Sequence, residues 1–490
     1  MPRITYNQFY KGVSQDDFLT NWPGVIEQKN INGLQTGYGA ILWPSSTKVR
    51  TIPNTETITA IWSNGDDTEW FIGTASGKIY NLHGADGEVE HYDFGSGYKI
   101  AEIYRVSSNI YFQVYDTPGN FGDITVFRVD YSDFRDDSAT NPPVAVEFTD
   151  NDFSPMSFET SSYFFIGEGG QIFRFTRGSS PVQTDFPIFR GFIIGMTYAG
   201  TRFNVYSRAN NKGLIAIWDW ISTSIEAQIE LNFTPVSVVT HQGIDYVCSD
   251  EGDIYVVSGY SYKRLSESRL SSRLDDNSQY IKQLFFSKDL QSNRMSQATS
   301  DVIYFKSKEE QPGIYSYDNI IPGISKGFQK TITQNHLFED YTSINDIYYQ
   351  KDIDSSENGL YIGGESTNTT SVDYVPIDTL NTVKDGYFIT EVFSGGTSFQ
   401  KKGISINYSV SNTSGSNFCK IYKRINNGAW ILFKTINHSV AGIYRDEINK
   451  PNDNFIDIQF KIELHNESGL LIDCPIFHEL TFDYEMTEKN

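Results

Sequence analysis

The sequence predicts an all-β protein in which a β-propeller of about seven blades is followed by a small antiparallel β-sandwich. Three observations lead to this prediction. The 490 residues include 34 Phe and 31 Tyr but only 20% charged residues, and such a composition favours sheets and excludes wholesale disorder. A strand–turn–strand pattern recurs between about residue 50 and residue 378. After Asp385 the pattern changes to strict alternation of apolar and polar residues.

The first 49 residues contain scattered aromatic residues and a Pro23-Gly24 step but no clean period. We interpret residues 1–49 as an extended N-terminal arm. Such an arm can also supply the strand that closes the propeller ring.

Residues 50–380 are predicted to form the propeller. Each unit has an apolar strand, a turn with Gly or Asp, and a second strand that often begins Ile-Tyr or Ile-Phe. The seven copies are Glu69–Leu82, Ile110–Val129, Tyr163–Phe175, Arg202–Asp219, Ile244–Val257, Val302–Asp318 and Leu360–Pro376. Each follows another short apolar run, such as Thr59–Trp62, Gly191–Met196 or Val236–Val239. Four short strands every 40 to 60 residues or so are typical of propeller blades, which bury their faces by packing round an axis.

One segment of the propeller region has helical periodicity. Leu270, Leu274, Ile281 and Leu284 are roughly in phase within Glu267–Ser287. This stretch coincides with the widest gap between hairpins, so we predict a helical insertion between blades.

Residues 386–490 are predicted to form the sandwich. In Phe455–Leu464 the apolar residues alternate strictly with polar ones, as in a half-buried antiparallel strand. Asn427-Gly428 separates two alternating runs within Lys420–Lys434, which is a strong hairpin signal. Further strands are predicted at Tyr387–Val392, Gly403–Val410 and Ile476–Tyr484.

Charge and cysteine content exclude several classes of protein. The 61 acidic and 39 basic residues give a net charge of −22, which argues against specific nucleic-acid binding. Cys248, Cys419 and Cys474 are too far apart for a CxxC zinc site or a disulfide framework. The opening residues resemble no secretory signal, and no run of 18 apolar residues occurs. We expect a soluble protein made in a reducing compartment, without membrane insertion.

No catalytic motif emerges from the sequence, so we predict no enzyme, catalytic residue, metal site or cofactor. The histidines lack metal-ligand spacing, and neither a Gly-x-Ser-x-Gly elbow nor a phosphate-binding loop occurs. The seven histidines are His83, His91, His241, His336, His438, His465 and His478. Each is interpreted as a surface or strand residue.

Carboxylates and tryptophans leave two weaker alternatives open. The acidic pairs Asp66-Asp67, Asp136-Asp137 and Asp275-Asp276 are candidates for glycosidase chemistry. Neighbouring strand residues point to opposite faces, so solvated turns are the favoured interpretation. Likewise the loop Asp352–Gly359 lacks the Gly and Glu of a calcium loop and is interpreted as an acidic turn. Sugar stacking is possible in principle for Trp62, Trp70, Trp218, Trp220 and Trp430, although a core role between blades is favoured for Trp218 and Trp220.

The layout of arm, propeller and terminal sandwich resembles that of structural proteins from the tails of double-stranded DNA bacteriophages. The segments Tyr6–Gly39 and Phe460–Glu485 look like the opening and closing segments of such proteins. The resemblance is to the propeller-bearing nozzle and tail-accessory proteins of short-tailed phages. It implies many copies assembled round the tail axis, or an appendage that reaches toward the host. An acidic channel wall would let DNA pass without sticking.

We therefore expect a structural component of a virion tail, made in the host cytoplasm, that acts through protein–protein contacts in a symmetric assembly. Its expected partners are copies of itself and other tail proteins. One alternative is carbohydrate binding or host recognition, with the sandwich as a lectin-like module that binds host surface glycans. Another is a polysaccharide-degrading propeller enzyme, which would need two carboxylates that converge in the axial cleft.

Overall fold

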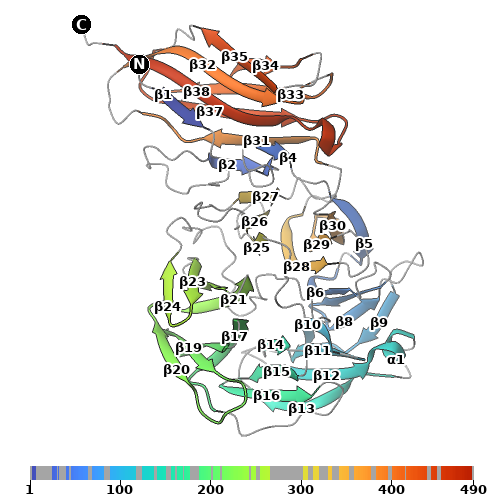
Figure 1. Cartoon of the computed structure of the whole chain (residues 1–490). Helices are drawn as coiled ribbons and strands as arrows, with labels where there is room; N and C mark the ends of the chain where they lie inside the picture. The colour runs from blue at the N-terminus through green and yellow to red at the C-terminus, as the bar shows by residue number, and fades with distance from the viewer. Residues whose placement is uncertain are drawn as a thin grey trace. The chain divides into compact units, whose positions relative to one another are not determined.

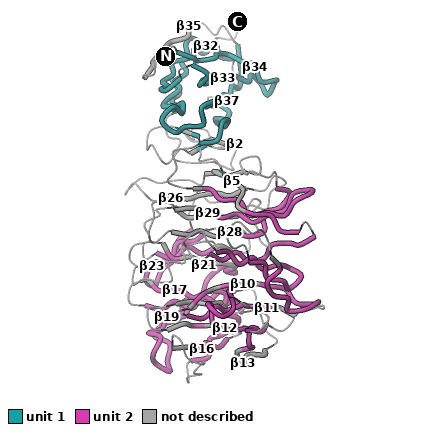
Figure 2. Tube along the Cα trace, turned by 90° about the vertical axis from the view of Figure 1, so that its right-hand side faces the viewer, with its two compact units in different colours: residues 1–46, 313–337, 378–490 teal, residues 47–312, 338–377 magenta. Residues whose placement is uncertain are grey.

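A computed structural model gives the fold of this chain. It describes residues 3–6, 25–29, 31–32, 40–42, 46–53, 55–63, 69–81, 89–106, 108–116, 124–136, 141–150, 156–159, 163–168, 170–176, 187–199, 202–209, 212–241, 244–249, 254–264, 302–306, 313–318, 329–333, 341–351, 358–376, 382–394, 400–413, 415–438, 443–449 and 454–487. Its contacts divide the chain into two compact units (Figure 2). Unit 1 comprises Met1–Ser46, Gly313–Leu337 and Asp378–Asn490, and unit 2 comprises Thr47–Pro312 and Phe338–Ile377.

Within the described residues, seven antiparallel sheets follow one another along the propeller region (Figure 1). The first three comprise β6 (Ile58–Ser63), β7 (Trp70–Thr74), β8 (Lys78–Asn81) and β9 (Val89–Asp93); β10 (Tyr98–Val106), β11 (Asn109–Asp116), β12 (Ile124–Asp130) and β13 (Val144–Asp150); and β14 (Met156–Glu159), β15 (Tyr163–Glu168) and β16 (Gln171–Thr176). The next two comprise β17 (Phe192–Ala199), β18 (Arg202–Ala209), β19 (Lys212–Trp218) and β20 (Ala227–Leu231); and β21 (Pro235–His241), β22 (Ile244–Ser249), β23 (Ile254–Ser258) and β24 (Ser261–Arg264). The last two comprise β25 (Val302–Lys306), β26 (Gly313–Asp318) and β27 (Gln329–Thr333); and β28 (Ser343–Lys351), β29 (Asn358–Glu365), β30 (Thr370–Pro376) and β5 (Thr47–Ile52).

The predicted repeats correspond to these sheets. Every one of the seven strand–turn–strand copies falls on two neighbouring strands of one sheet, which confirms the all-β propeller prediction. A short helix, α1 (Tyr131–Asp136), follows β12, and its Phe134 is buried. The predicted helix Glu267–Ser287 lies outside the described residues. Among the helices that the structure does describe, none is long and apolar enough to cross a membrane.

A strand from the N-terminal side completes the last sheet. β5 pairs antiparallel with β30, from Thr370 opposite Ile52 to Tyr374 opposite Thr47. The last sheet also packs on the first, because the side chain of Asp346 in β28 accepts the backbone N–H of Ile61 in β6 at 3.0 Å. The ring is therefore closed by residues that are far apart in the sequence.

Recurring glycines explain how neighbouring blades approach so closely. Three second strands contain an Ile-Gly pair, and a Cβ on each glycine would lie 2.5–2.9 Å from an isoleucine in the first strand of the next sheet. These contacts join Gly73 to Ile100, Gly167 to Ile193 and Gly363 to Ile61. Contacts below 3.0 Å are essentially never seen for real Cβ atoms, so only glycine lets the next isoleucine reach this depth. The repeated sequence Ile-Gly thus marks a blade-to-blade packing site.

The sandwich consists of two five-stranded sheets. One has the order β1-β38-β32-β35, with β36 beside β32, and the other has the order β2-β31-β37-β33-β34. The strands of the first sheet are β1 (Arg3–Tyr6), β32 (Lys401–Ser411), β35 (Ile443–Asn449), β36 (Asn454–Phe455) and β38 (Ile476–Met486). Those of the second are β2 (Val25–Lys29), β31 (Asp385–Thr390), β33 (Phe418–Ile425), β34 (Ile431–Ile436) and β37 (Ile458–His465). A two-stranded ladder of β3 (Ile31–Asn32) and β4 (Ile41–Leu42) and a 3-10 turn, η3 (Leu471–Asp473), belong to the same unit. The contacts also assign β26 and β27 to this unit, although residues 50–380 were predicted to form the propeller.

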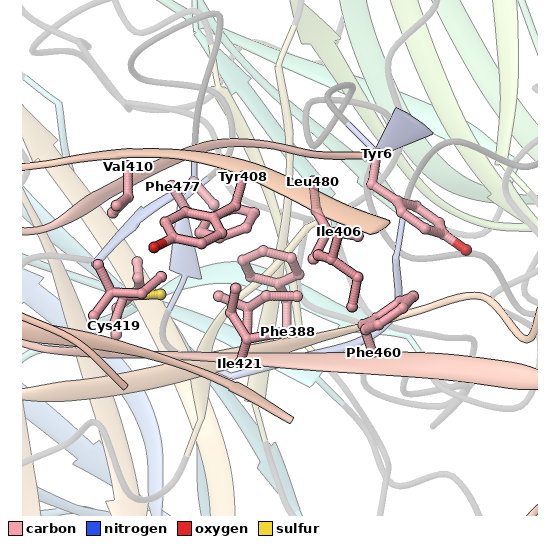
Figure 3. Close-up of a cluster of buried hydrophobic side chains, with 14 of the residues drawn as sticks. Tyr6, Phe388, Ile406, Tyr408, Val410, Cys419, Ile421, Phe460, Phe477 and Leu480 are labelled. Carbon is pink, nitrogen blue, oxygen red and sulfur yellow. The ribbon is translucent and has the colours of Figure 1, made fainter. Parts of the chain in front are cut away.

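The alternating residues of both sheets form one core (Figure 3). Phe388, Ile421 and Phe460 come from one sheet, and Tyr408 and Phe477 from the other. In β37, the predicted core residues from Ile458 to Leu464 are buried, as expected for period-two alternation. Ile456 differs from the prediction because it is 39% exposed and precedes the strand.

Residues 1–49 were predicted to form an extended arm, and the described parts of this segment instead belong largely to the sandwich. β1 pairs with the last strand, β38, and β2 pairs with β31. Tyr6 is buried in the sandwich core together with Ile31, Ala40 and Leu42. The physical reason is that each sheet has an edge that β1 or β2 can extend, while the apolar side chains of the segment fill the core.

Candidate functional site

The hairpin of β33 and β34 is the candidate contact site of the sandwich. The sequence predicted a hairpin centred on Asn427-Gly428, and the structure places the two central residues one position earlier. Asn426 and Asn427 have φ values of 47° and 56°, and the N–H of Gly428 donates to the carbonyl of Ile425 at 2.9 Å. These two left-handed residues form a tight turn at the start of the loop 426–430 that joins β33 and β34, and asparagine tolerates this conformation better than most residues do.

The turn is held against the segment that precedes β37. The side-chain oxygen of Asn426 accepts the N–H groups of Ile456 and Asp457 at 2.8 and 3.1 Å. The N–H of Asn426 also donates to the carbonyl of Asp457 at 2.9 Å. These bonds explain why Ile456 is excluded from the strand, and they fix the direction in which the hairpin projects.

β34 is an exposed edge strand with apolar residues on both of its faces. It pairs with β33 and with no other described strand. Ile431 and Leu432 are 55% and 49% exposed, and as neighbours in a strand they point to opposite faces. Neither face of this end of the hairpin is therefore covered by the rest of the unit. An exposed apolar edge of this kind is a ready template for another strand.

Basic side chains on this sheet stack over aromatic rings. Lys423 lies 4.9 Å from the ring centre of Phe433, and Arg424 lies 4.7 Å from that of Trp430. On the same sheet, Lys420 stacks over Phe418, and Lys461 stacks over Tyr387 and Tyr422. Each such contact is worth about 0.5–1 kcal/mol at an exposed site. The stacking fixes the positions of these cations on the sheet, where Lys423 is itself buried.

The hairpin is basic although the chain is acidic. Residues 418–437 contain Lys420, Lys423, Arg424 and Lys434 and no Asp or Glu, against a net charge of −22 for the whole chain. On the adjacent strand Glu463 pairs with Lys461 at 2.7 Å. Burial, followed by a hydrogen bond with Glu463, raises the pKa of Tyr422 to about 12, so its hydroxyl stays protonated at neutral pH.

A second polar group lies at the end of the same sheet. His465 Nδ1 lies 2.5 Å from Asp385 Oδ1, and its Nε2 lies 3.2 Å from Glu467 Oε2. The imidazole ring stacks on Phe418 with 4.5 Å between ring centres. A hydrogen bond from Lys384 is the main cause that lowers the pKa of Glu467. The described residues contain no group of three or more His, Cys, Asp or Glu side chains that could hold a metal ion.

The propeller has a buried carboxylate that sequence reasoning missed. Asp245 in β22 is fully buried, and its Oδ2 accepts hydrogen bonds from Thr197, Asn204 and Tyr206 at 2.6–2.7 Å. Its Oδ1 accepts a fourth from Thr240 at 2.7 Å. Thr197, Asn204 and Tyr206 belong to the sheet of β17–β20, so this carboxylate ties two neighbouring sheets together. An aspartate inside the apolar run Ile244–Val247 was the available signal.

Other buried acids in the propeller are also bonded within the chain. Glu69 accepts hydrogen bonds from Asn81 at 3.3 Å and from the hydroxyl of Tyr131. Asp373 accepts a hydrogen bond from the hydroxyl of Tyr341. A buried carboxylate needs such donors because its charge is otherwise costly to remove from water. Asp245, Glu69 and Asp373 therefore have a structural role, because each accepts hydrogen bonds from side chains of the same chain.

The acidic pairs singled out from the sequence are mostly not described. Asp66-Asp67, Asp137, Asp275-Asp276 and residues 352–357 of the suggested calcium loop lie outside the described residues. Asp136 is exposed at the end of α1 and pairs with Arg135 at 2.9 Å. Asp136 is the member of these pairs that the structure describes.

The tryptophans divide into buried and surface residues. Trp62, Trp70 and Trp218 are buried among propeller side chains, which agrees with the core role favoured for Trp218. Trp220 packs at the edge of the same cluster as Trp218. Trp430, on the hairpin, is half-buried beside Arg424. Of these five tryptophans, Trp430 lies on the surface of the sandwich, where a basic side chain stacks on it.

The histidines and cysteines have structural surroundings where they are described. His91 Nε2 lies 2.6 Å from the carbonyl of Phe134, and His478 Nε2 lies 2.9 Å from the hydroxyl of Ser411. His83 and His336 lie outside the described residues. Cys419 and Cys474 are buried thiols of the sandwich core.

Comparisons with known proteins found structural neighbours but no sequence match. No family model matches the sequence, and no curated protein matches it. A chain of the mitotic checkpoint complex crystal structure is 12% identical, with 68% of this chain and 96% of that chain covered and a TM-score of 0.43. The RRP9 WD40 repeats are 10% identical, with 69% and 99% covered and a TM-score of 0.42. Chaetomium thermophilum Raptor is 10% identical, with 70% of this chain and 29% of that chain covered and a TM-score of 0.45. At these values the likeness identifies no family and no activity.

Proposed function

We propose that this chain is a non-enzymatic structural component of a bacteriophage virion, in its tail, and that it acts through protein–protein contacts in a symmetric assembly. The observation that carries the proposal is the β33–β34 hairpin, a fixed, projecting edge with exposed apolar residues on both faces. Surfaces of this kind are typical of protein–protein contacts. The layout of propeller and sandwich, which resembles that of phage tail proteins, supplies the virion context.

The propeller supports the proposal as a rigid body. The ring is closed by β5 against β30, and Asp245 links two sheets through four hydrogen bonds. Such a ring offers a stable disc on which an assembly can be built. The partners are copies of this chain and other tail proteins, which meet after synthesis in the host cytoplasm.

The test is the mass of the purified protein across a range of concentrations, together with negative-stain images. We expect symmetric multimers, because symmetric tails are built from repeated contacts. A protein that stays monomeric at every concentration would contradict self-assembly.

A second candidate function is binding of host surface glycans by the sandwich. It is favoured by Trp430, Tyr422 and Tyr387 beside basic side chains on one sheet, since sugar rings stack on aromatic side chains and acidic sugars attract cations. Glycan titration of the wild type and of Trp430→Ala tests this candidate. Saturable binding that is lost in Trp430→Ala and kept in Trp220→Ala would support it.

A further inference from the structure

We propose that the β33–β34 hairpin is a head-to-tail contact, in which the open edge of β34 receives an extended acidic segment from a second copy of this chain. The inference rests on the proposed assembly function, and it adds which surface makes the contact, how the contact forms and which partner it takes.

The first step of the argument is the backbone of β34. One side of the strand is bonded to β33, from Lys423 opposite Ile431 to Cys419 opposite Ile436. Its other side has no partner among the described strands. Peptide groups on that side need hydrogen bonds, and an added strand supplies them in the pattern known from sheet-edge recognition.

The second step is the side chains that flank this edge. Ile431 and Leu432 are half-exposed and lie on opposite faces. An added strand places its own side chains over both faces, whereas a partner that docked on one face would leave the other apolar residue in water. Strand addition is therefore the geometry that covers both residues.

The third step is charge, which selects the partner and the symmetry. All charged residues of the hairpin (residues 418–437) are basic. A second copy of the chain carries a net charge of −22 and so offers acidic segments. Pairing β34 with the β34 of another copy would instead place the exposed Lys434 of both copies on neighbouring strands, with the basic β33 strands behind them, and like charges across a strand pair are destabilising. The contact therefore joins two different surfaces, and such contacts build rings or open chains of copies.

The test compares substitutions on the hairpin with a matched control. The double variant Ile431→Glu with Leu432→Glu places two negative charges at the edge, which lowers the formal charge of residues 418–437 from +4 to +2, and it removes the apolar side chains of the edge. The double variant Ile431→Lys with Leu432→Lys also removes the apolar side chains of the edge, but it keeps the charge of the hairpin positive. The control is Ile472→Glu, an apolar residue of the same unit that is 80% exposed and lies in η3. Circular dichroism and thermal melts establish that all variants fold, and sedimentation over a concentration series measures assembly.

We expect the glutamate pair to weaken assembly at least roughly thirty-fold, since the exposed halves of two large aliphatic side chains no longer become buried. The lysine pair should weaken it less, and Ile472→Glu should leave it unchanged. Wild-type assembly should also fall as salt is added, because the charges that meet are at the surface.

Mixing experiments test the head-to-tail geometry. A copy with the glutamate pair keeps its acidic surface and can still bind a wild-type hairpin, so it should cap growing assemblies and shorten them. If the contact instead joined two β34 strands, the glutamate-pair copy would not bind the wild type. Wild-type assemblies of unchanged length in the mixture would therefore overturn the head-to-tail arrangement.

The outcomes separate this inference from the proposed function. Wild-type assembly that persists in the glutamate pair would overturn the hairpin contact and leave the assembly function standing. Wild-type protein that never assembles would overturn both. Binding of dextran sulfate that depends on Ile431 and Leu432, with assembly unaffected, would assign the hairpin to a polyanion and also overturn the contact.

Discussion

Replacing Asp245 with alanine should destabilise the propeller by about 4 kcal/mol. The carboxylate accepts hydrogen bonds from Thr197, Asn204, Tyr206 and Thr240. Thr197, Asn204 and Tyr206 are buried, and a buried donor that loses its partner costs about 1–3 kcal/mol. Because the hydroxyl groups of Thr197 and Tyr206 can turn toward other acceptors, the lower end of that range applies to each of them, and the middle of the range applies to the amide of Asn204. Their sum gives the expected value.

The conservative variant provides the internal control. In Asp245→Asn the amide oxygen can face the three buried donors, and the amide N–H₂ can face Thr240, whose hydroxyl can also accept. We therefore expect Asp245→Asn to cost only about 1–2 kcal/mol. The surface variant Asp136→Ala, which breaks an exposed pair with Arg135, should change stability by less than about 0.5 kcal/mol.

Urea unfolding followed by tryptophan fluorescence is the assay, since Trp218 is buried in the sheet that contacts Asp245. Hydrogen exchange of β17 and β22 assigns the transition to the propeller, because a chain with two units need not unfold in one step. Equal midpoints for Asp245→Ala and the wild type would refute the reasoning, since they would mean that the four bonds contribute nothing net.

Three further predictions concern the blade contacts and the N-terminal strand. Gly73→Ala should lower the urea midpoint of the propeller by an amount equivalent to about 1–3 kcal/mol. The same substitution should cost less in an Ile100→Ala background, which lacks the Cγ2 atom nearest to the added methyl group; additive effects in this double-mutant cycle would contradict the contact. Tyr6→Ala should destabilise the sandwich by about 3–5 kcal/mol, as for other large buried aromatic residues, and an unchanged melt would show that β1 is dispensable. The hydrogen bond from Arg3 is the main cause that lowers the pKa of Asp483, so its contribution is fully present above the ordinary aspartate pKa and is lost as the pH falls through the lowered value. Exchange protection of β1 measured against pH should show this loss, and Asp483→Asn should abolish the pH dependence.

The repeats of the propeller could be read from local patterns. An apolar strand, a tight turn and a second strand leave a signature within about 15 residues, as in Glu69–Leu82, and that signature depends only on strand periodicity and turn chemistry. The Ile-Gly pairs could be recognised in the sequence of the same segments. Their role in blade packing could not be predicted, because Gly73 is needed only where Ile100 of the next blade approaches it.

The candidate site was predicted in part. The hairpin within Lys420–Lys434 was expected, because Asn-rich turns between alternating runs are a strong local signal. That both Ile431 and Leu432 are exposed could not be expected, since alternation predicts that one of two neighbours is buried. Their exposure is a property of the packed sandwich, in which β34 lies at the edge of its sheet.

The amino-acid sequence by itself determined the all-β class, the sevenfold repeat and the change to a sandwich, because strand period, turn residues and aromatic content act over a few neighbouring residues. Only the tertiary structure decided that β1 pairs with β38 and that β5 completes the sheet of β30. It also decided that Asp245 receives donors from another sheet, up to 48 residues away in the chain. Such partners are chosen by which edges and buried charges come together when the whole chain packs. No local spacing carries that information, because an open strand edge accepts any complementary strand that folding brings to it.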